Sequence, residues 1–90
     1  MPTEIVHPYI ISRRDIGAGR PIIAGTRTRV ANIVTYYKQG LSPEELAREF
    51  PHLSLSHIHD ALSYYYEHRQ ELDREIDEEL EDNLKGLPSK

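Results

Sequence analysis

One segment, Gly19 to Val30, mixes residue types that no single helix or strand would use. Pro21 fixes its backbone φ angle, and Gly19 and Gly25 permit the positive φ angles that tight turns need. The segment therefore predicts a turn, a short strand, a second turn and the entry to a helix. It carries arginines but no obvious nucleophile, metal cluster or phosphate-binding loop, which indicates a role in backbone shape and positive charge.

The chain is short, with 90 residues, and this length predicts one domain that buries only a modest core. Contacts with a partner would add to its stability, so a homodimer is expected. The sequence has no cysteine, which excludes disulfides and thiolate zinc sites, and no apolar run long enough to cross a membrane. We therefore expect a cytoplasmic protein with no membrane partner.

The net charge of -4 hides an uneven distribution along the chain. Residues 1–40 carry six cations against two acids, whereas residues 67–90 carry nine acids against four cations. Residues 41–66 are also acidic on balance. The amino-terminal half is therefore expected to attract an anionic partner, and the carboxyl-terminal end is expected to repel one.

Two short extended runs precede the helices. Residues 5–12 are mostly apolar and β-branched, and Pro8 restricts the predicted strand to the residues after it or to a sheet edge. Residues 15–19 have the composition of a turn, and residues 21–24 form the second extended run. We expect the two runs to pair as a small antiparallel sheet, which needs helices or a second chain for support.

The first two predicted helices have clear start and stop signals. Apolar residues recur at helical spacing from Val30 to Tyr37, and Gly40 stands where a carboxyl-terminal cap belongs. The run Ser42-Pro43-Glu44-Glu45 then predicts a second helix. In that run the serine is the N-cap, the proline occupies the first helical position and Glu45 completes a reciprocal capping box.

A third helix is predicted after Pro51, with Ser54 as its N-cap. Its expected inward residues are Ile58, Ala61, Leu62 and Tyr65. The three helices fit a helix-turn-helix-like or winged-helix-like domain and, equally well, a generic three-helix bundle. The fold class is thus mainly α with a short N-terminal β element over residues 1–66, followed by an acidic amphipathic extension over residues 67–90.

Several runs together resemble a bacterial and archaeal family catalogued as domain of unknown function 433. The runs are Gly19 to Arg27, Gly40 to Leu46 and Phe50 to Leu53, with Val30, Ile33, Ile58, Ala61 and Leu62 between and after them. The resemblance covers roughly residues 9–66. It implies a small helix-turn-helix-like helical domain that follows short β-structure. The sequence departs from the family pattern at Ala18 and at Thr28-Arg29.

The resemblance also implies a function. Members of this family are commonly regarded as antitoxins of type II toxin–antitoxin pairs, encoded beside a PIN-related nuclease toxin. A nuclease-type toxin protein and operator DNA are therefore the expected partners. The alternatives are a stand-alone DNA-binding transcriptional regulator and a structural or assembly adaptor.

Two sets of residues are candidate DNA contacts. The first set are arginines that would bind phosphates, and the second set are exposed positions at the start of the third helix that would read bases. These are Arg13, Arg14, Arg20 and Arg29, and Ser56, His57 and His59. The second set contains no arginine or lysine, so DNA affinity is expected to be modest and to depend on a dimer or on the toxin. Arg27 is expected to pair with the glutamate-rich second helix instead.

The acidic extension keeps one apolar stripe at three- and four-residue spacing, formed by Leu72, Ile76, Leu80 and Leu84. We predict that this stripe binds a groove on the partner while the flanking acids face a basic surface. The alternative is a solvated helix that only lengthens the third one.

Neither metal binding nor catalysis is expected. No two of the histidines at positions 52, 57, 59 and 68 have the four-residue spacing that places two ligands on one helical face. The acids of the extension have no histidine or nucleophile beside them. The sequence therefore predicts a binding protein without a cofactor.

Overall fold

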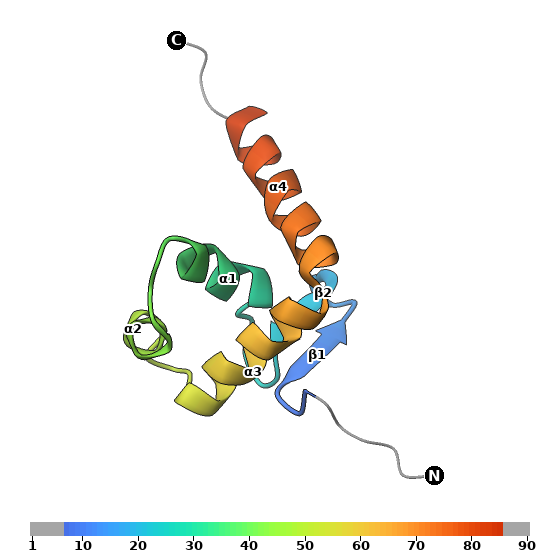
Figure 1. Ribbon diagram of the computed structural model, residues 1–90. Coiled ribbons are helices and arrows are strands. Elements are labelled where there is room, and N and C mark those ends of the chain that lie inside the picture. Colours follow the sequence, from blue (N-terminus) through green and yellow to red (C-terminus); the bar gives the residue numbers. More distant parts are fainter. Residues whose placement is uncertain (1–6, 86–90) are drawn as a thin grey trace.

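The computed structural model describes residues 7–85, and over this range it is mainly helical with a short N-terminal sheet (Figure 1). This architecture confirms the predicted fold class at that level. Side chains are described for all of these residues except 16–18 and 80–85. The elements in chain order are β1 (Ile10–Arg13), β2 (Ile16–Ile23), α1 (Val30–Lys38), α2 (Pro43–Glu49), α3 (Leu55–Glu67) and α4 (Arg69–Lys85).

The two strands form an antiparallel hairpin in which Ile10 lies opposite Ile23 and Ile11 lies opposite Ile22. As predicted, β1 begins after Pro8. The turn is shorter than expected, because β2 already starts at residue 16 rather than after residue 19. Two residues are enough to reverse the chain, and the positive φ of the glycine at position 19 (84°) is accommodated inside the strand.

The helix caps agree with the sequence signals. At the start of α2, the Ser42 hydroxyl accepts from the backbone N–H of Glu45 (3.2 Å), and Glu45 accepts from the N–H of Ser42 (2.8 Å). Ser54 caps α3 in the same way, but there the reciprocal acceptor is Nδ1 of His57, 3.0 Å from the Ser54 nitrogen. Gly40 has a φ angle of 106° after α1, as a carboxyl-terminal cap requires.

The hydrophobic core lies where α1, α2 and α3 meet, and β2 closes one side of it. The inward residues predicted for α3, Ile58, Ala61, Leu62 and Tyr65, are all buried. The core also includes one residue from the sheet, Ile23, and one from the acidic extension, Leu72. None of the helices in residues 7–85 is long and apolar enough to cross a membrane.

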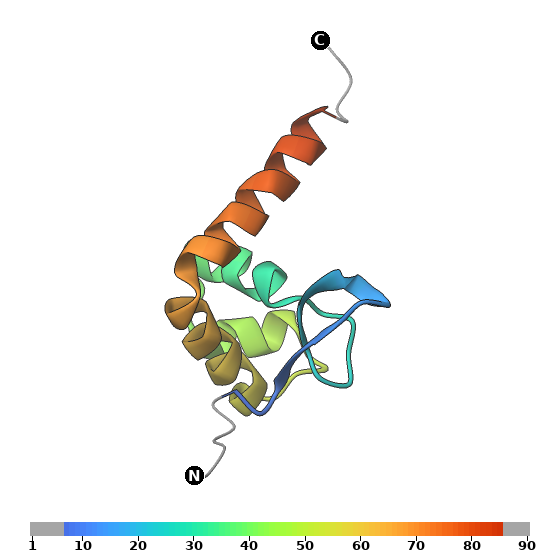
Figure 2. The ribbon, with the colours of Figure 1, turned by 90° about the vertical axis from the view of Figure 1, so that its right-hand side faces the viewer.

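The acidic extension is a separate helix and not a continuation of α3. The chain bends at His68, whose φ and ψ angles are −130° and 41°. The first half of α4 then packs on the domain through Leu72 and, in part, Ile76. The second half extends beyond the other elements in both views (Figures 1 and 2). We refer to this second half, residues 77–85, as the α4 arm.

Candidate functional site

Two arginines of the basic N-terminal half bind glutamates of α4. The Arg29 guanidinium contacts the Glu79 carboxylate and lies 3.6 Å from Glu75 Oε2. Arg20 donates to Glu79 (3.2 Å) and lies 4.0 Å from Glu78. Two of the four arginines predicted to bind phosphate are therefore occupied by carboxylates of the same chain.

Glu75 is the most buried charged group in this cluster. Only 8% of the residue is exposed, and Oε2 has no hydrogen-bond donor among the described residues. Burial raises the pKa of Glu75 above its ordinary value, although the charges of Arg20 and Arg29 act in the opposite direction. The carboxylate thus depends on the two guanidinium groups for compensation, and these ion pairs hold α4 against β2 and the start of α1.

A second polar contact joins α4 to α1 and α3. Lys38 Nζ lies 2.7 Å from Asp73 Oδ1, and the Tyr65 hydroxyl donates to the same oxygen (3.0 Å). The hydrogen bond to Lys38 is the main cause that lowers the pKa of Asp73. The guanidinium of Arg69 lies over the rings of Tyr65 and Tyr66 at 5.9 and 5.8 Å.

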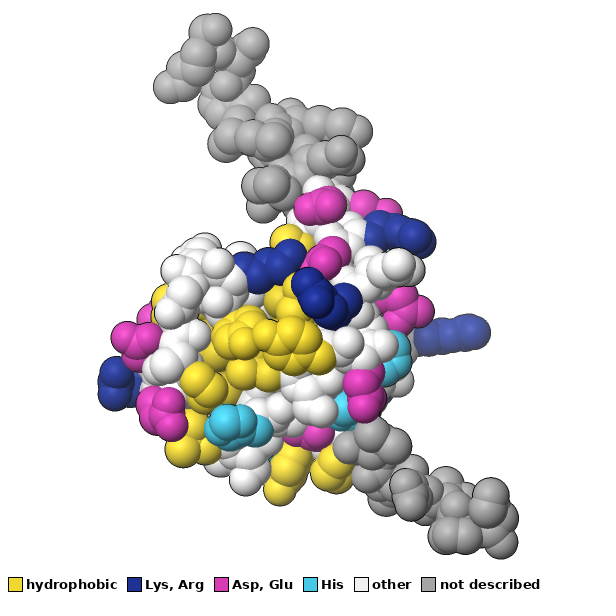
Figure 3. Space-filling model, viewed as in Figure 1, with side chains coloured by type: hydrophobic (Ala, Val, Ile, Leu, Met, Phe, Trp, Pro, Cys, Tyr) yellow, Lys and Arg dark blue, Asp and Glu magenta, His cyan; other side chains and the backbone are white. Residues whose placement is uncertain are grey.

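Beside this contact, Figure 3 shows hydrophobic side chains gathered on the face over α1 and α3, with basic side chains at the edge. Tyr66 on α3 is 53% exposed, and its hydroxyl lies 2.6 Å from that of Tyr37 on α1. Exposed tyrosines beside cations are common at protein–protein interfaces. This face is a candidate contact surface.

Arg13, Arg14 and Arg27, in and after the hairpin, have no ion pair with α4 among the described residues. Arg13 is paired with its neighbour Asp15 at 2.7 Å, and both side chains are more than half exposed. Arg14 is also exposed. Arg27 was expected to pair with α2, yet it has no ion pair among the described residues and instead helps to line a cavity beside the hairpin. Its exposed position at the turn before α1 leaves its charge to solvent.

The three candidate base-reading residues at the start of α3 differ in their exposure. Ser56 and His59 are exposed. His57 is only partly exposed, because its ring completes the helix cap and packs edge-on against Tyr9 at 4.6 Å between centroids. Of the three, Ser56 and His59 present free side chains, and His57 serves the fold.

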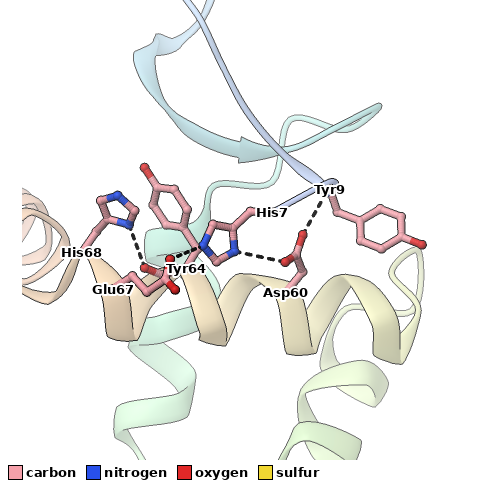
Figure 4. Close-up of polar contacts among 6 residues, drawn as sticks. All are labelled: His7, Tyr9, Asp60, Tyr64, Glu67 and His68. Carbon is pink, nitrogen blue, oxygen red and sulfur yellow. Dashed lines mark hydrogen bonds and ion pairs between the residues drawn. The ribbon is translucent and has the colours of Figure 1, made fainter. Parts of the chain in front are cut away.

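A contact that the sequence did not indicate joins the segment before β1 to α3 (Figure 4). The two ring nitrogens of His7 lie 3.1 Å from Asp60 and 2.6 Å from Glu67. Asp60 also accepts from the backbone N–H of Tyr9 (2.8 Å). Partial burial lowers the pKa of His7, but the hydrogen bonds and charges of Glu67 and Asp60 outweigh it, so that the pKa is raised overall.

The raised pKa of His7 predicts a pH-dependent contribution to stability. Because the pKa of His7 is higher in the folded state than in the unfolded state, its contribution to stability is complete below the unfolded-state pKa. This contribution is lost as the pH rises through the folded-state pKa. We expect His7→Ala to remove this part of the pH dependence between about pH 6 and about pH 8.5. Urea unfolding at both pH values measures it, and His59→Ala, which changes an exposed histidine of α3, is the control. Equal pH dependence in wild type and His7→Ala would contradict the assignment.

The predicted partner-binding stripe divides at the middle of α4. Leu72 is 1% exposed and belongs to the chain's own core, and Ile76 packs partly against it. In this conformation Leu72 is therefore not free to bind a partner. The side chains of Leu80 and Leu84 lie outside the described residues. Within the described part of the chain, no three His, Cys, Asp or Glu residues are grouped to hold a metal ion.

Comparison with known proteins connects this arrangement to one family. The sequence pattern of the family described as "Protein of unknown function (DUF433)" matches residues 10–65. The crystal structure of a DUF433 member protein from Anabaena variabilis is similar to this chain, with a TM-score of 0.71 and 30% sequence identity. The similarity covers 77% of this chain and 68% of that one. No curated protein matches the sequence.

Proposed function

We propose that this chain, a member of the DUF433 family, is an antitoxin-like protein. It binds and neutralises a nuclease-type toxin. The observation that carries the proposal is the α4 arm, an acidic helical segment that extends beyond the domain (Figures 1 and 2). The protein acts by covering its partner and not by catalysis. An antitoxin is also the function that the resemblance to the family implies.

The way α4 is attached supports this use of the arm. Leu72 in the core and the ion pairs of Arg29 with Glu75 and Glu79 fix the helix as far as the first turn of the arm. Beyond Glu79 the helix continues to residue 85 and extends past the other described elements of the chain (Figure 2). A helix anchored at one end presents its free turns to a groove with little loss of entropy on binding.

The composition of the arm supports a basic partner. Positions 77–82 contain five acids, and leucines stand at positions 80 and 84. Leucines at helical spacing are the anchors by which amphipathic helices bind hydrophobic grooves. Glu78 and Glu79 contact Arg20 and Arg29 of the same chain, and the other acids match the positive surface with which a nuclease binds its nucleic acid substrate. The arm therefore fits a partner of that class and competes with its substrate.

Co-expression with the product of the neighbouring reading frame tests the proposal. We expect the two proteins to co-elute, and we expect Leu80→Asp with Leu84→Asp to weaken the complex by about 100-fold, since each lost anchor removes about 1–2 kcal/mol. Leu55→Asp, at an exposed leucine of α3, is the matched control. Thermal unfolding confirms that the variants fold. A complex that survives the double substitution unchanged, or no complex at all, would refute this function.

We assign binding of operator DNA, the second expected partner, to the residues that remain exposed. Arg13 and Arg14 at the hairpin tip, with Ser56 and His59 on α3, support it, whereas Arg20 and Arg29 are occupied by α4. A gel shift with the protein's own promoter is expected to weaken, and its salt dependence to decrease, in Arg13→Ala with Arg14→Ala. No shift even in the presence of the toxin would exclude this part. DNA binding without any toxin complex would favour the stand-alone regulator.

A further inference from the structure

We propose that the cleft between the hairpin and the first half of α4 binds a small alkylamine through its ammonium group. The volume of this cleft is about 310 Å³, at the lower end of the range of about 300–1,000 Å³ that is usual for small-molecule sites. We call it the amine cleft; the residues that line it and carry the argument are Ser12, Arg20, Pro21, Tyr64, Glu71 and Glu75. This inference concerns a ligand of the chain itself and goes beyond the proposed function.

Glu75 is the residue whose hydrogen bonding a ligand would complete. The residue is 8% exposed, and its Oε2 atom has no hydrogen-bond donor among the described residues. Arg29 Nη1 lies 3.6 Å from this oxygen, beyond the range of about 2.7–3.2 Å for an N–H···O hydrogen bond. A buried carboxylate oxygen without a donor costs free energy. An ammonium group carries only donors, so it is the complementary ligand group.

The charges around the amine cleft favour a cation over an anion. The guanidinium groups of Arg20 and Arg29 are already bound by glutamates of α4. Glu71 is exposed and has no ion pair in the part of the chain that the structure describes. It lies four positions before Glu75, and like charges at this spacing in a helix repel each other. A cation bound by both carboxylates removes this repulsion.

The rest of the lining suits a short apolar chain. Pro21 and Tyr64 are half-buried and lie on opposite elements, β2 and α3. The ring of Tyr64 stacks on His68 at 4.1 Å between centroids, which fixes its orientation (Figure 4). Burial raises the pKa of Tyr64, and the charges of Glu71 and Glu75 raise it further. The negative potential of the two carboxylates therefore extends to the wall along which the alkyl chain would lie.

A ligand in the amine cleft would stabilise the fold, because the cleft is formed by elements that are distant in the sequence. Ser12 belongs to β1, Tyr64 to α3 and Glu75 to α4. A molecule that binds only the folded state raises the midpoint of thermal unfolding as its concentration increases. Bound amine is thus expected to fasten the first half of α4 to the hairpin.

Isothermal titration calorimetry of the full chain with n-butylamine tests the proposal. This amine is protonated at neutral pH and has a short apolar chain. We expect saturable binding in the millimolar range or tighter, together with a higher midpoint of thermal unfolding. The matched ligand is n-butanol, which has the same chain without the charge and should not bind. Absence of saturable binding, or equal binding of the alcohol, would overturn the proposal.

Substitutions that remove single carboxylates locate the site. Glu75→Gln keeps the shape of the side chain and is expected to weaken n-butylamine binding at least about tenfold, since hydrogen bonds to charged groups are among the strongest. Glu71→Gln changes an exposed residue that the fold does not require, and it should weaken binding about threefold. Asp77→Asn is the control, because it removes an exposed acid of α4 outside the cleft.

The variants also distinguish a site from general attraction of amines to an acidic chain. Thermal unfolding without ligand shows whether each variant folds, and Glu71→Gln decides the question if Glu75→Gln does not. Unchanged binding in the folded cleft variants, or equal weakening by Asp77→Asn, would reject the amine cleft. These measurements contain neither toxin nor DNA, so their failure leaves the proposed function standing.

Discussion

Leu72→Ala is expected to lower the free energy of unfolding by about 2–5 kcal/mol, the range for truncating a fully buried leucine. Leu72 is 1% exposed and is the residue by which α4 enters the core. The loss is large beside the total of about 5–15 kcal/mol that a small domain has. Urea unfolding followed by circular dichroism measures it, and the helical signal of α4 should be lost with that of the domain.

Leu55→Ala is the matched control for this experiment. It removes the same atoms from a leucine that is 43% exposed, so we expect a change of less than about 1 kcal/mol. A Leu72→Ala variant as stable as Leu55→Ala would show that α4 does not belong to the core in solution. It would also remove the anchor from which the α4 arm extends.

Arg29→Met is expected to destabilise the protein by about 1–3 kcal/mol. Removing one partner of a buried ion pair costs about 3–5 kcal/mol when the other charge is left uncompensated. Here a quarter of the Arg29 side chain is exposed, and Arg20 remains close to the same carboxylates, so the smaller value applies. The methionine retains the apolar packing of the arginine stem, which isolates the effect of the charge.

Two comparisons separate this effect from general loss of charge. Arg13→Met removes an exposed ion pair with Asp15 and should change stability by less than about 1 kcal/mol. Arg29→Met with Glu75→Leu should recover much of the loss, because no buried charge is then left without a partner. Equal effects of Arg29→Met and Arg13→Met would contradict the structural role of Glu75.

The parts of the fold that the sequence predicted correctly depend on neighbouring residues. The capping box of Ser42 and Glu45, the cap at Ser54 and the buried face of α3 each involve residues within one or two turns. Such signals act through local hydrogen bonds and helical spacing, which the sequence displays directly. The antiparallel pairing of β1 and β2 was predictable for the same reason, since a short turn joins them.

The candidate site was less accessible to sequence reasoning, because it depends on contacts between distant positions. His7 meets Asp60 across 53 positions, and Arg20 meets Glu79 across 59. The charge asymmetry indicated a basic and an acidic end of the chain, but not that Arg20 and Arg29 would bind glutamates of the acidic end. Leu72 has the same helical spacing as the other residues of the predicted partner-binding stripe. The spacing does not show that Leu72 is buried in the core of its own chain.

The sequence by itself determined the elements, their caps, the absence of cysteine and the separation of charge between the two ends of the chain. Only the tertiary structure decided that the chain bends at His68, that Leu72 is buried, and that glutamates of α4 bind Arg20 and Arg29, which leaves Arg13, Arg14 and Arg27 exposed. The physical reason is the range of the interactions. Hydrogen bonds within one turn are set by adjacent residues, whereas the burial of a leucine or a carboxylate depends on every element that packs around it.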